Sequence, residues 1–262
     1  MAPSELGLVA QAATHHNNIG GDEMKKVALI TGASKGIGAV IAHKFAEKGM
    51  AVALTARSEN DLKEVAAKIS SRGQTKPLII PADLRNENQI AQIPEKVMEK
   101  WGRIDVLVNN AGLGFLKPFM EISIEEFRNM LDVNIQAVFS LTQKVLPYMI
   151  ERKSGDIVNI ASLAGKNGFK GGTGYAASKW ALRGFAQCLM LEVREHDIRV
   201  ITIFPGSVHT GFGSGGTSPT GTPPQNKIQA VDIAETAYLA ITMPQRTMVS
   251  EIDMRPSNTS KK

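Results

Sequence analysis

The chain has 262 residues, of which 43% are hydrophobic and 21% are charged. This composition is that of an ordinary globular protein, and it excludes a fibrous or largely disordered chain. The formal net charge is +5, but the cations are scattered among the acids. Neither a basic groove for nucleic acid nor a basic membrane-binding patch is therefore expected. No segment approaches the roughly 20 apolar residues of a membrane-spanning helix.

Residues 1–24 differ from the rest of the chain. They are polar, they lack the basic and apolar regions of a secretory signal, and they contain no arginine. Neither a signal peptide nor a transit peptide is indicated. We interpret residues 1–24 as a flexible N-terminal arm, residues 25–256 as one domain and residues 257–262 as a C-terminal tail. Met24, just before the first apolar run, is a candidate natural start.

From residue 26 onward, short apolar runs alternate with amphipathic segments. The runs cover residues 27–31, 51–55, 78–80, 104–109, 157–160, 200–204 and 249–254. Runs without polar alternation are typical of strands buried on both faces of a parallel sheet. Ser58 and Ser123, each followed three residues later by an acid, predict helix starts with capping boxes. The pattern predicts a single doubly wound α/β domain of Rossmann type with a seven-stranded parallel sheet.

Residues 211–229 interrupt this alternation. They are rich in Gly, Pro, Ser and Thr, and Phe212 is the only large apolar side chain before residue 226. The segment follows the sixth predicted strand, at the sheet edge where α/β proteins bind ligands. We interpret it as a mobile substrate loop, with a loose linker as the alternative.

A glycine-rich turn joins the first predicted strand to the first predicted helix. Glycines let the chain turn tightly and bring a pyrophosphate to the N-terminus of a helix. No Gly-Lys-Ser/Thr sequence ends the turn, so it is not a nucleotide-triphosphate loop. The candidate cofactor contacts in this turn are Gly32, Ser34, Lys35, Gly36, Ile37 and Gly38.

The end of the second predicted strand bears on which dinucleotide binds. An NAD enzyme usually has a carboxylate there for the ribose 2′-hydroxyl. Here the residues are Ala56, Arg57 and Ser58. The guanidinium of Arg57 suits a phosphate, and Lys35 projects toward the same region. These residues favour NADP(H), while the alternative is a pair of solvated surface cations.

Tyr175 and Lys179 stand four residues apart at the start of a predicted helix, and so share one face. A lysine ammonium about 5 Å from the phenol would lower its pKa by about two units, toward the range useful for proton transfer. Ser162, which follows the fifth predicted strand, is placed to hydrogen-bond a carbonyl oxygen. The Tyr-Lys spacing alone occurs by chance, so the argument rests on the whole set of motifs.

This set resembles the short-chain dehydrogenase/reductase family in its compact single-domain form. The resemblance covers residues 26 to about 210, with a further matching strand near the C-terminus. The motifs are Thr31-Gly32-x-x-x-Gly36-x-Gly38, Ala82-Asp83-Leu84, Asn109-Asn110-Ala111-Gly112, Asp132-Val133-Asn134, Ser162, Tyr175-x-x-x-Lys179 and Pro205-Gly206-Ser207-Val208-x-Thr210.

The resemblance implies a catalytic tetrad. Tyr175 would donate the proton in reduction, and Lys179 would hold the nicotinamide ribose and tune Tyr175. Ser162 would orient and polarise the carbonyl, and Asn134 would hold a water in a proton relay through Lys179. The further cofactor contacts that it implies are Asp83 and Leu84 near the adenine, Asn110, Ala111 and Gly112 near the ribose, and Pro205, Gly206, Val208 and Thr210 near the carboxamide.

The substrate is weakly encoded. Members that reduce 3-oxoacyl groups on acyl carrier protein resemble this chain in the glycine turn and in Tyr-Ala-Ala-Ser-Lys, but their final strand commonly contains Gly-Gly. This chain ends differently over residues 249–256, more like reductases of small carbonyls, 3-hydroxy acids or pterins. Candidates for an apolar pocket, each as well explained by the core, are Leu113, Phe115, Leu116, Phe119, Leu163, Phe169 and Phe212.

The sequence therefore predicts an NADP(H)-dependent reductase of a small carbonyl substrate, with acyl carrier protein as an alternative partner. A non-catalytic NADP(H)-sensing module is the alternative of another class. The resemblance also implies a homodimer or homotetramer, formed through the long helices around Asn134 and Tyr175. Cys188 is the only cysteine, so a reducing, cytoplasmic location is expected. We expect Cys188 to be buried in a helix, and the histidines indicate no metal site.

Overall fold

The computed structural model describes residues 25–212 and 226–258. The predicted N-terminal arm, most of the predicted substrate loop and the end of the tail lie outside the described residues.

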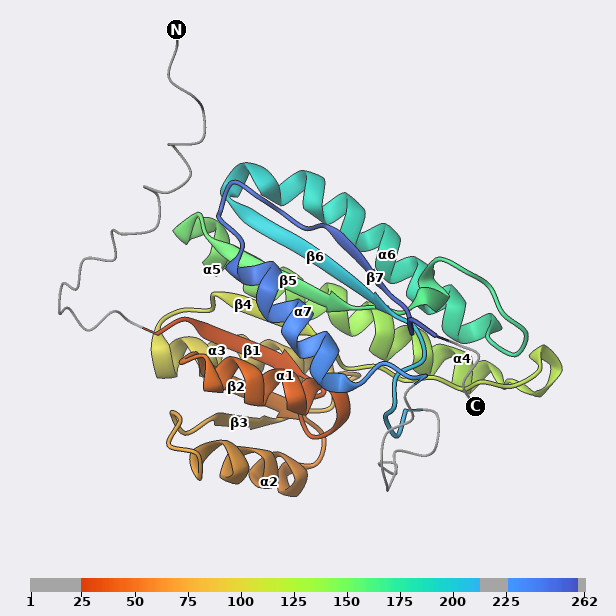
Figure 1. Ribbon diagram of the computed structural model, residues 1–262, viewed down its shortest axis with the longest axis horizontal. Coiled ribbons are helices and arrows are strands. Elements are labelled where there is room, and N and C mark those ends of the chain that lie inside the picture. The colour runs from red at the N-terminus through yellow and green to blue at the C-terminus, as the bar shows by residue number, and fades with distance from the viewer. Residues whose placement is uncertain (1–24, 213–225, 259–262) are drawn as a thin grey trace, which may run out of the picture.

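Seven parallel strands form one sheet with the order β3-β2-β1-β4-β5-β6-β7 (Figure 1). The strands are β1 Val27–Thr31, β2 Ala51–Ala56, β3 Leu78–Pro81, β4 Val106–Asn109, β5 Gly155–Ile160, β6 Ile198–Pro205 and β7 Glu251–Met254. The strand order runs outward in opposite directions from the β1–β4 pair. The doubly wound, single-domain prediction is confirmed, and each strand end lies within two residues of its prediction.

Helices cover both faces of the sheet. The main helices are α1 Gly36–Glu47, α2 Glu59–Ser70, α3 Glu87–Trp101, α4 Ile124–Leu131, α5 Ala137–Arg152, α6 Thr173–Val193 and α7 Ala230–Thr242. Shorter turns are η2 Phe119–Glu121, the π-helical η3 Asp132–Gln136, η4 Leu163–Gly165 and η5 Arg194–His196. α1, α2 and α7 pack on one face, and α3, α5 and α6 pack on the other (Figure 1).

Two cores explain why the strands lack polar alternation. Along β1, Ala28 and Ile30 join the core under α1, α2 and α7. Val27 and Leu29 join the core under α3, α5 and α6. Side chains of a strand point alternately to the two faces, so a sheet covered on both sides needs apolar residues at every position.

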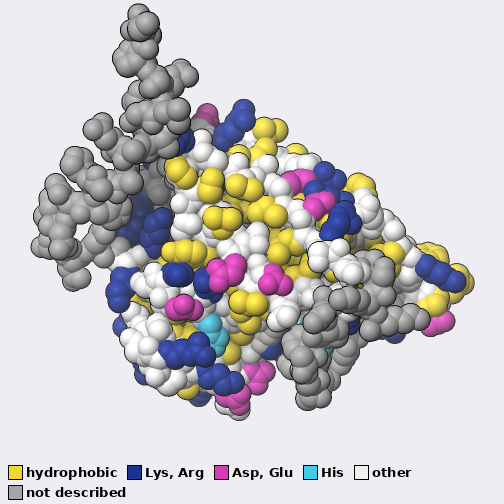
Figure 2. Space-filling view, in the orientation of Figure 1, with side chains coloured by type: hydrophobic (Ala, Val, Ile, Leu, Met, Phe, Trp, Pro, Cys, Tyr) yellow, Lys and Arg dark blue, Asp and Glu magenta, His cyan; other side chains and the backbone are white. Residues whose placement is uncertain are grey.

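Ion pairs fasten the amino ends of the central strands. The Asp105 carboxylate accepts the N–H of Val27 at 2.7 Å and pairs with the guanidinium groups of Arg103 and Arg152. Although burial opposes it, these donors hold the pKa of Asp105 below its usual value. The surface shown in Figure 2 mixes acidic, basic and hydrophobic side chains. No helix among the described residues is long and apolar enough to cross a membrane.

Local predictions were made for two helix caps and for the burial of Cys188. Ser123 and Glu126 form the predicted capping box at α4. Ser58 caps α2 by accepting the N–H of Asp61, so only this half of the predicted capping box forms there. The prediction that Cys188 is buried is wrong. Cys188 is exposed, because it lies outside the face of α6 that Leu182, Ala186 and Leu189 bury.

Candidate active site

The candidate site lies where the carboxyl ends of β1 and β4 diverge. The Thr31 hydroxyl accepts the N–H groups of Asn110 and Ala111 at 2.9 and 3.0 Å. The Asn110 amide donates back to the Thr31 carbonyl oxygen at 2.8 Å. These bonds hold the glycine turn against the end of β4, at the strand reversal where open α/β sheets bind ligands. Thr31 was recognised in the motif, but this coupling was not predicted.

The glycines of the turn are required by space and by backbone conformation. Gly32 and Gly36 have φ values of +62° and +57°, which disfavour other residues. A Cβ on Gly38 would lie 2.4 Å from both the Gly32 carbonyl oxygen and the Asn110 side-chain nitrogen. Lys35 precedes α1, and its side chain makes no cap there. The first N–H groups of α1 therefore suit an anion such as a pyrophosphate.

Cations surround Asp83 beyond the end of β2. Arg57 is exposed and contributes to lowering the pKa of Asp83, whose main cause is the hydrogen bond from Arg85. The Arg85 guanidinium contacts both carboxylate oxygens, at 3.1 and 2.7 Å, and donates to Asn129 at 3.2 Å. An adenine contact by Asp83 would therefore be made beside Arg85. Arg85 was not predicted as a site residue, although its position two residues after Asp83 could have indicated it.

Tyr175, Lys179 and Ser162 converge under the same end of the sheet. Tyr175 and Lys179 lie on the first two turns of α6, and Ser162 caps η4 by accepting the Ala164 N–H at 3.1 Å. The Ser162 hydroxyl also hydrogen-bonds the Tyr175 phenol. Lys179 is 3% exposed, its Nζ donates to the Ile160 carbonyl oxygen at 3.1 Å, and it lies 5.9 Å from the centre of the Tyr175 ring.

Burial dominates the ionisation of this pair. It raises the pKa of Tyr175 to about 12, against the opposing hydrogen bond of Ser162. It lowers the pKa of Lys179 to about 8. We expected Lys179 to lower the pKa of Tyr175; instead, burial of the phenol raises it. The reason is that the phenol loses its hydration while the ammonium is itself destabilised and bonded to Ile160.

Asn134 lies in the π-helical turn η3 between α4 and α5, not inside a regular helix. Its buried side chain accepts the Leu113 N–H and donates to the Leu113 carbonyl and the Ser178 hydroxyl, all at 2.8 Å. A Cβ on Gly112 would lie 3.5 Å from Asn134 Oδ1 and 3.7 Å from Lys179 Nζ. Asn134 thus anchors the chain beside the tyrosine, and its water-holding role stays a prediction.

The segment after β6 folds back over the glycine turn. Gly206 donates its N–H to the Met254 carbonyl at 2.8 Å, and Val208 forms an isolated parallel bridge with Ile228. Thr210 lies 3.9 Å from the position of a Cβ on Gly36. The structure therefore brings this motif, which begins at Pro205, beside the glycine turn. Leu84 is half-buried and packs against the core under α3.

Apolar side chains close one side of the site. Leu113 and Phe115 pack against a buried cluster that includes Tyr175. Leu163 packs with a neighbouring cluster around Phe204. Phe212 packs on Tyr175 itself. Leu116, Phe119 and Phe169 are exposed, and Phe119 is the most exposed of the three, at 70%.

Comparisons with known proteins agree with this arrangement. The family model described as short chain dehydrogenase matches residues 26–218. An uncharacterized oxidoreductase of Staphylococcus saprophyticus is 38% identical over 231 residues, 88% of this chain and 97% of that protein. The chain belongs to the short-chain dehydrogenase/reductase family.

Solved structures of this family are similar over nearly the whole chain. An alcohol dehydrogenase from the archaeon Thermococcus sibiricus, complexed with 5-hydroxy-NADP, has a TM-score of 0.83 and 32% identity, covering 89% of this chain and 97% of its own. A metagenomic short-chain oxidoreductase in complex with NADP has a TM-score of 0.78 and 37% identity, covering 89% and 98%. A similar fold also holds NAD, so family membership does not choose the cofactor.

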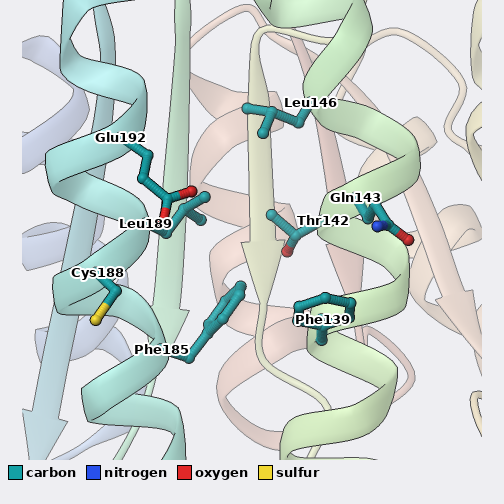
Figure 3. Close-up of a pocket in the computed structure, with 8 residues that line it drawn as sticks. All are labelled: Phe139, Thr142, Gln143, Leu146, Phe185, Cys188, Leu189 and Glu192. Atoms are coloured by element: carbon teal, nitrogen blue, oxygen red, sulfur yellow. The ribbon is translucent and has the colours of Figure 1, made fainter.

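A hollow lies away from this site, on the outer face of α5 and α6 (Figure 3). It has a volume of about 360 Å³. The Phe139 and Phe185 rings meet there across the two helices, 5.8 Å apart. The lining residues are Phe139, Thr142, Gln143, Leu146, Phe185, Cys188, Leu189 and Glu192.

Proposed function

We propose that this family member is an NADP(H)-dependent reductase that interconverts a carbonyl group and a secondary alcohol. The observation that carries the proposal is the meeting of the Tyr175 and Ser162 hydroxyls near buried Lys179, on the side of the sheet where the glycine turn leads into α1. Gly32 to Gly38 would hold the pyrophosphate, Arg57 and Lys35 the 2′-phosphate, and Lys179 the nicotinamide ribose. The bound cofactor supplies the hydride that the carbonyl carbon accepts.

The protein's own residues would deliver the proton. With a pKa near 12, Tyr175 is protonated at neutral pH and can donate its phenolic proton to the carbonyl oxygen. Ser162 accepts the Ala164 N–H, and the proton that it directs at the Tyr175 phenol would turn toward the same oxygen when a carbonyl binds. Two hydroxyl donors on one oxygen stabilise the negative charge that develops there. Lys179, with Asn134, would resupply the proton that Tyr175 gives up.

Tyr175→Phe tests the catalytic role. It removes the proton donor and keeps the ring, so turnover should fall by at least about a thousandfold while NADPH affinity stays nearly the same. The measurement is NADPH oxidation over acetoacetyl thioesters, diketones, aromatic aldehydes, 3-oxo acids and a pterin, with NADPH binding titrated by fluorescence. Wild-type turnover in the variant would refute the assignment. Binding without turnover of any carbonyl would favour the sensing module. Turnover of the thioesters alone would favour the acyl-carrier alternative.

The 2′-phosphate assignment has a separate test. Arg57→Asp replaces the exposed cation with the carboxylate that NAD enzymes place at this strand end. NADPH affinity should fall by more than tenfold, about 1.4 kcal/mol, and NADH affinity should hold or rise. Arg72→Asp, a charge reversal elsewhere on the surface, is the control. Equal losses for both dinucleotides would refute the proposed contact.

We also propose that the chain is a homodimer or homotetramer, joined through α5 and α6. The support is the hollow on these two helices, which is lined by the exposed ring of Phe139 packed on the ring of Phe185.

A further inference from the structure

Phe212 lies against the ring of Tyr175. The two ring centroids are 5.5 Å apart and the planes are inclined by 50°, a favourable geometry for an aromatic pair. The Phe212 N–H donates to the Thr210 hydroxyl at 3.4 Å. Since Thr210 lies beside Gly36, the turn that carries Phe212 rests on the glycine turn and reaches across to the tyrosine.

Gly114 makes room for this pair. A Cβ at Gly114 would lie 2.9 and 3.0 Å from two carbon atoms of the Phe212 ring and 3.2 Å from Cδ2 of Tyr175. Gly114 is not among the glycines with positive φ, so its backbone conformation does not require glycine. Space is the reason, and the chain lacks a side chain at the point where the two rings meet.

The Phe212 ring also faces outward. It remains 44% exposed, while Leu113 and Phe115 on the neighbouring side belong to the partly buried shell around Tyr175. A substrate that accepts a proton from Tyr175 must bring its carbonyl oxygen to about 2.6–3.2 Å from the phenol oxygen. The groups on its carbonyl carbon would then come within van der Waals reach of what covers the Tyr175 ring.

We propose that Phe212 is a specificity-determining residue, whose ring fills the space over Tyr175 and Gly114 and so admits only a small group on that side of the substrate carbonyl. This inference rests on the proposed reductase function. Ketones with a methyl group on one side of the carbonyl are substrates, and ketones with a branched group there are excluded.

Phe212→Ala tests the selectivity. The kcat/KM values are measured for two ketones that differ only in a methyl or a tert-butyl group beside the reacting carbonyl. The ratio of branched to methyl substrate should rise at least about tenfold in the variant, the scale at which apolar sites discriminate such groups. The ratio in Phe212→Leu should fall between those of the parent and Phe212→Ala. Leu239→Ala, which removes an exposed apolar side chain on α7, should leave the ratio unchanged. An unchanged ratio in Phe212→Ala would overturn the inference.

A double-mutant cycle tests the packing without relying on turnover. Gly114→Ala, Phe212→Ala and the double variant are unfolded in denaturant. Residues in contact do not act additively. The factor by which Gly114→Ala lowers the folding equilibrium constant should therefore be at least about ten times larger in the parent than in Phe212→Ala. Additive effects would overturn the proposed contact. A parent that binds NADPH but reduces no carbonyl would instead contradict the proposed function, and with it any selectivity.

Discussion

At the scale of single residues, burial shifts the pKa values of the two ionisable groups of the site in opposite directions. The phenol of Tyr175 loses water that would stabilise its anion, and the ammonium of Lys179 loses water that would stabilise its cation. Both residues are therefore pushed toward their neutral forms. A neutral tyrosine is the form that can donate a proton, as the proposed reduction requires at neutral pH.

The first prediction at this scale concerns the titration of Tyr175 in the cofactor-free chain. Its folded pKa is about 12 and its ordinary value 10.0, so at a pH of about 10.5 an ordinary tyrosine is mostly ionised and Tyr175 is not. Phenolate absorbance at that pH, read within milliseconds of a pH jump, should be the same in the parent and in Tyr175→Phe. The same reading in denaturant, where Tyr175 ionises near its ordinary value, is the control and should be smaller in Tyr175→Phe. A smaller signal in folded Tyr175→Phe would show that Lys179 dominates the tyrosine, as the sequence alone suggested.

The second prediction concerns stability and Lys179. Its pKa falls from 10.5 in the unfolded chain to about 8 in the folded one. Between these values the unfolded state binds more protons, so the free energy of unfolding rises with pH. Lys179→Met removes this dependence. The stability of the parent relative to the variant should increase by about 2 kcal/mol from pH 8 to pH 10, at up to 1.36 kcal/mol per unit. Denaturant titrations of the cofactor-free proteins measure it, and a flat or falling difference would contradict it.

What the sequence could predict at this scale was residue type and spacing. Tyr175, Lys179 and Ser162 were identified from their motifs, and the structure brings them together. The depth of burial that sets their pKa values depends on segments distant in sequence. The fit of Phe212 to Gly114 joins residues about a hundred positions apart, and no local pattern marks it.

At the scale of elements, the uninterrupted apolar runs predicted strands because both faces of this sheet are covered. The π-helical turn η3 was not predicted, since an extra residue in a helical turn changes the backbone hydrogen bonds and leaves no clear mark on composition. The result is a buried Asn134 whose side chain reaches the Leu113 backbone, a contact that links the α4–α5 junction to the site.

A pair of glycines separates packing from propensity. Gly38 and Gly184 both lie in helices, α1 and α6. A Cβ on Gly38 would collide with the Gly32 carbonyl, whereas a Cβ on Gly184 would meet nothing within 4 Å. Gly184→Ala should therefore stabilise the chain by about 0.5–1 kcal/mol through helix propensity. Gly38→Ala should destabilise it by about 1–3 kcal/mol through overpacking and weaken NADPH binding. Denaturant unfolding and a fluorescence titration measure both, and similar effects of the two substitutions would contradict the packing account.

At the scale of the whole molecule, the strand order explains why residues from distant motifs meet. The strand order runs in opposite directions on the two sides of the β1–β4 pair, and the loops after these two parallel strands separate there. The glycine turn, the Asn110 segment, Ser162 and the motif after β6 all follow carboxyl ends of parallel strands. The sequence could predict this convergence, because parallel strands put all their carboxyl ends at one edge. It could not predict which outer helix faces stay exposed.

The exposed outer faces of α5 and α6 bear on how copies of the chain assemble. α5 and α6 carry Phe139, 52% exposed, and Leu191, 59% exposed, around the hollow that Cys188 and Phe185 line (Figure 3). A stable dimer buries about 800 Å² on each partner with an apolar centre, and this face offers such a centre. We expect the parent to sediment at a multiple of 28.2 kDa at micromolar concentration.

Charges placed in that centre should prevent assembly, because an unpaired carboxylate is costly to bury. Phe139→Asp together with Leu191→Asp should sediment as a 28.2 kDa monomer with an unchanged circular dichroism spectrum, since both side chains are exposed on the folded chain. Phe119→Asp together with Met120→Asp places the same two charges on a separate surface, where both side chains are also exposed, and should keep the parent's mass. If the control dissociates and the α5–α6 variant does not, the interface lies at the η2 end of the molecule. If the parent is itself a monomer, the exposed rings of α5 and α6 do not join copies of this chain.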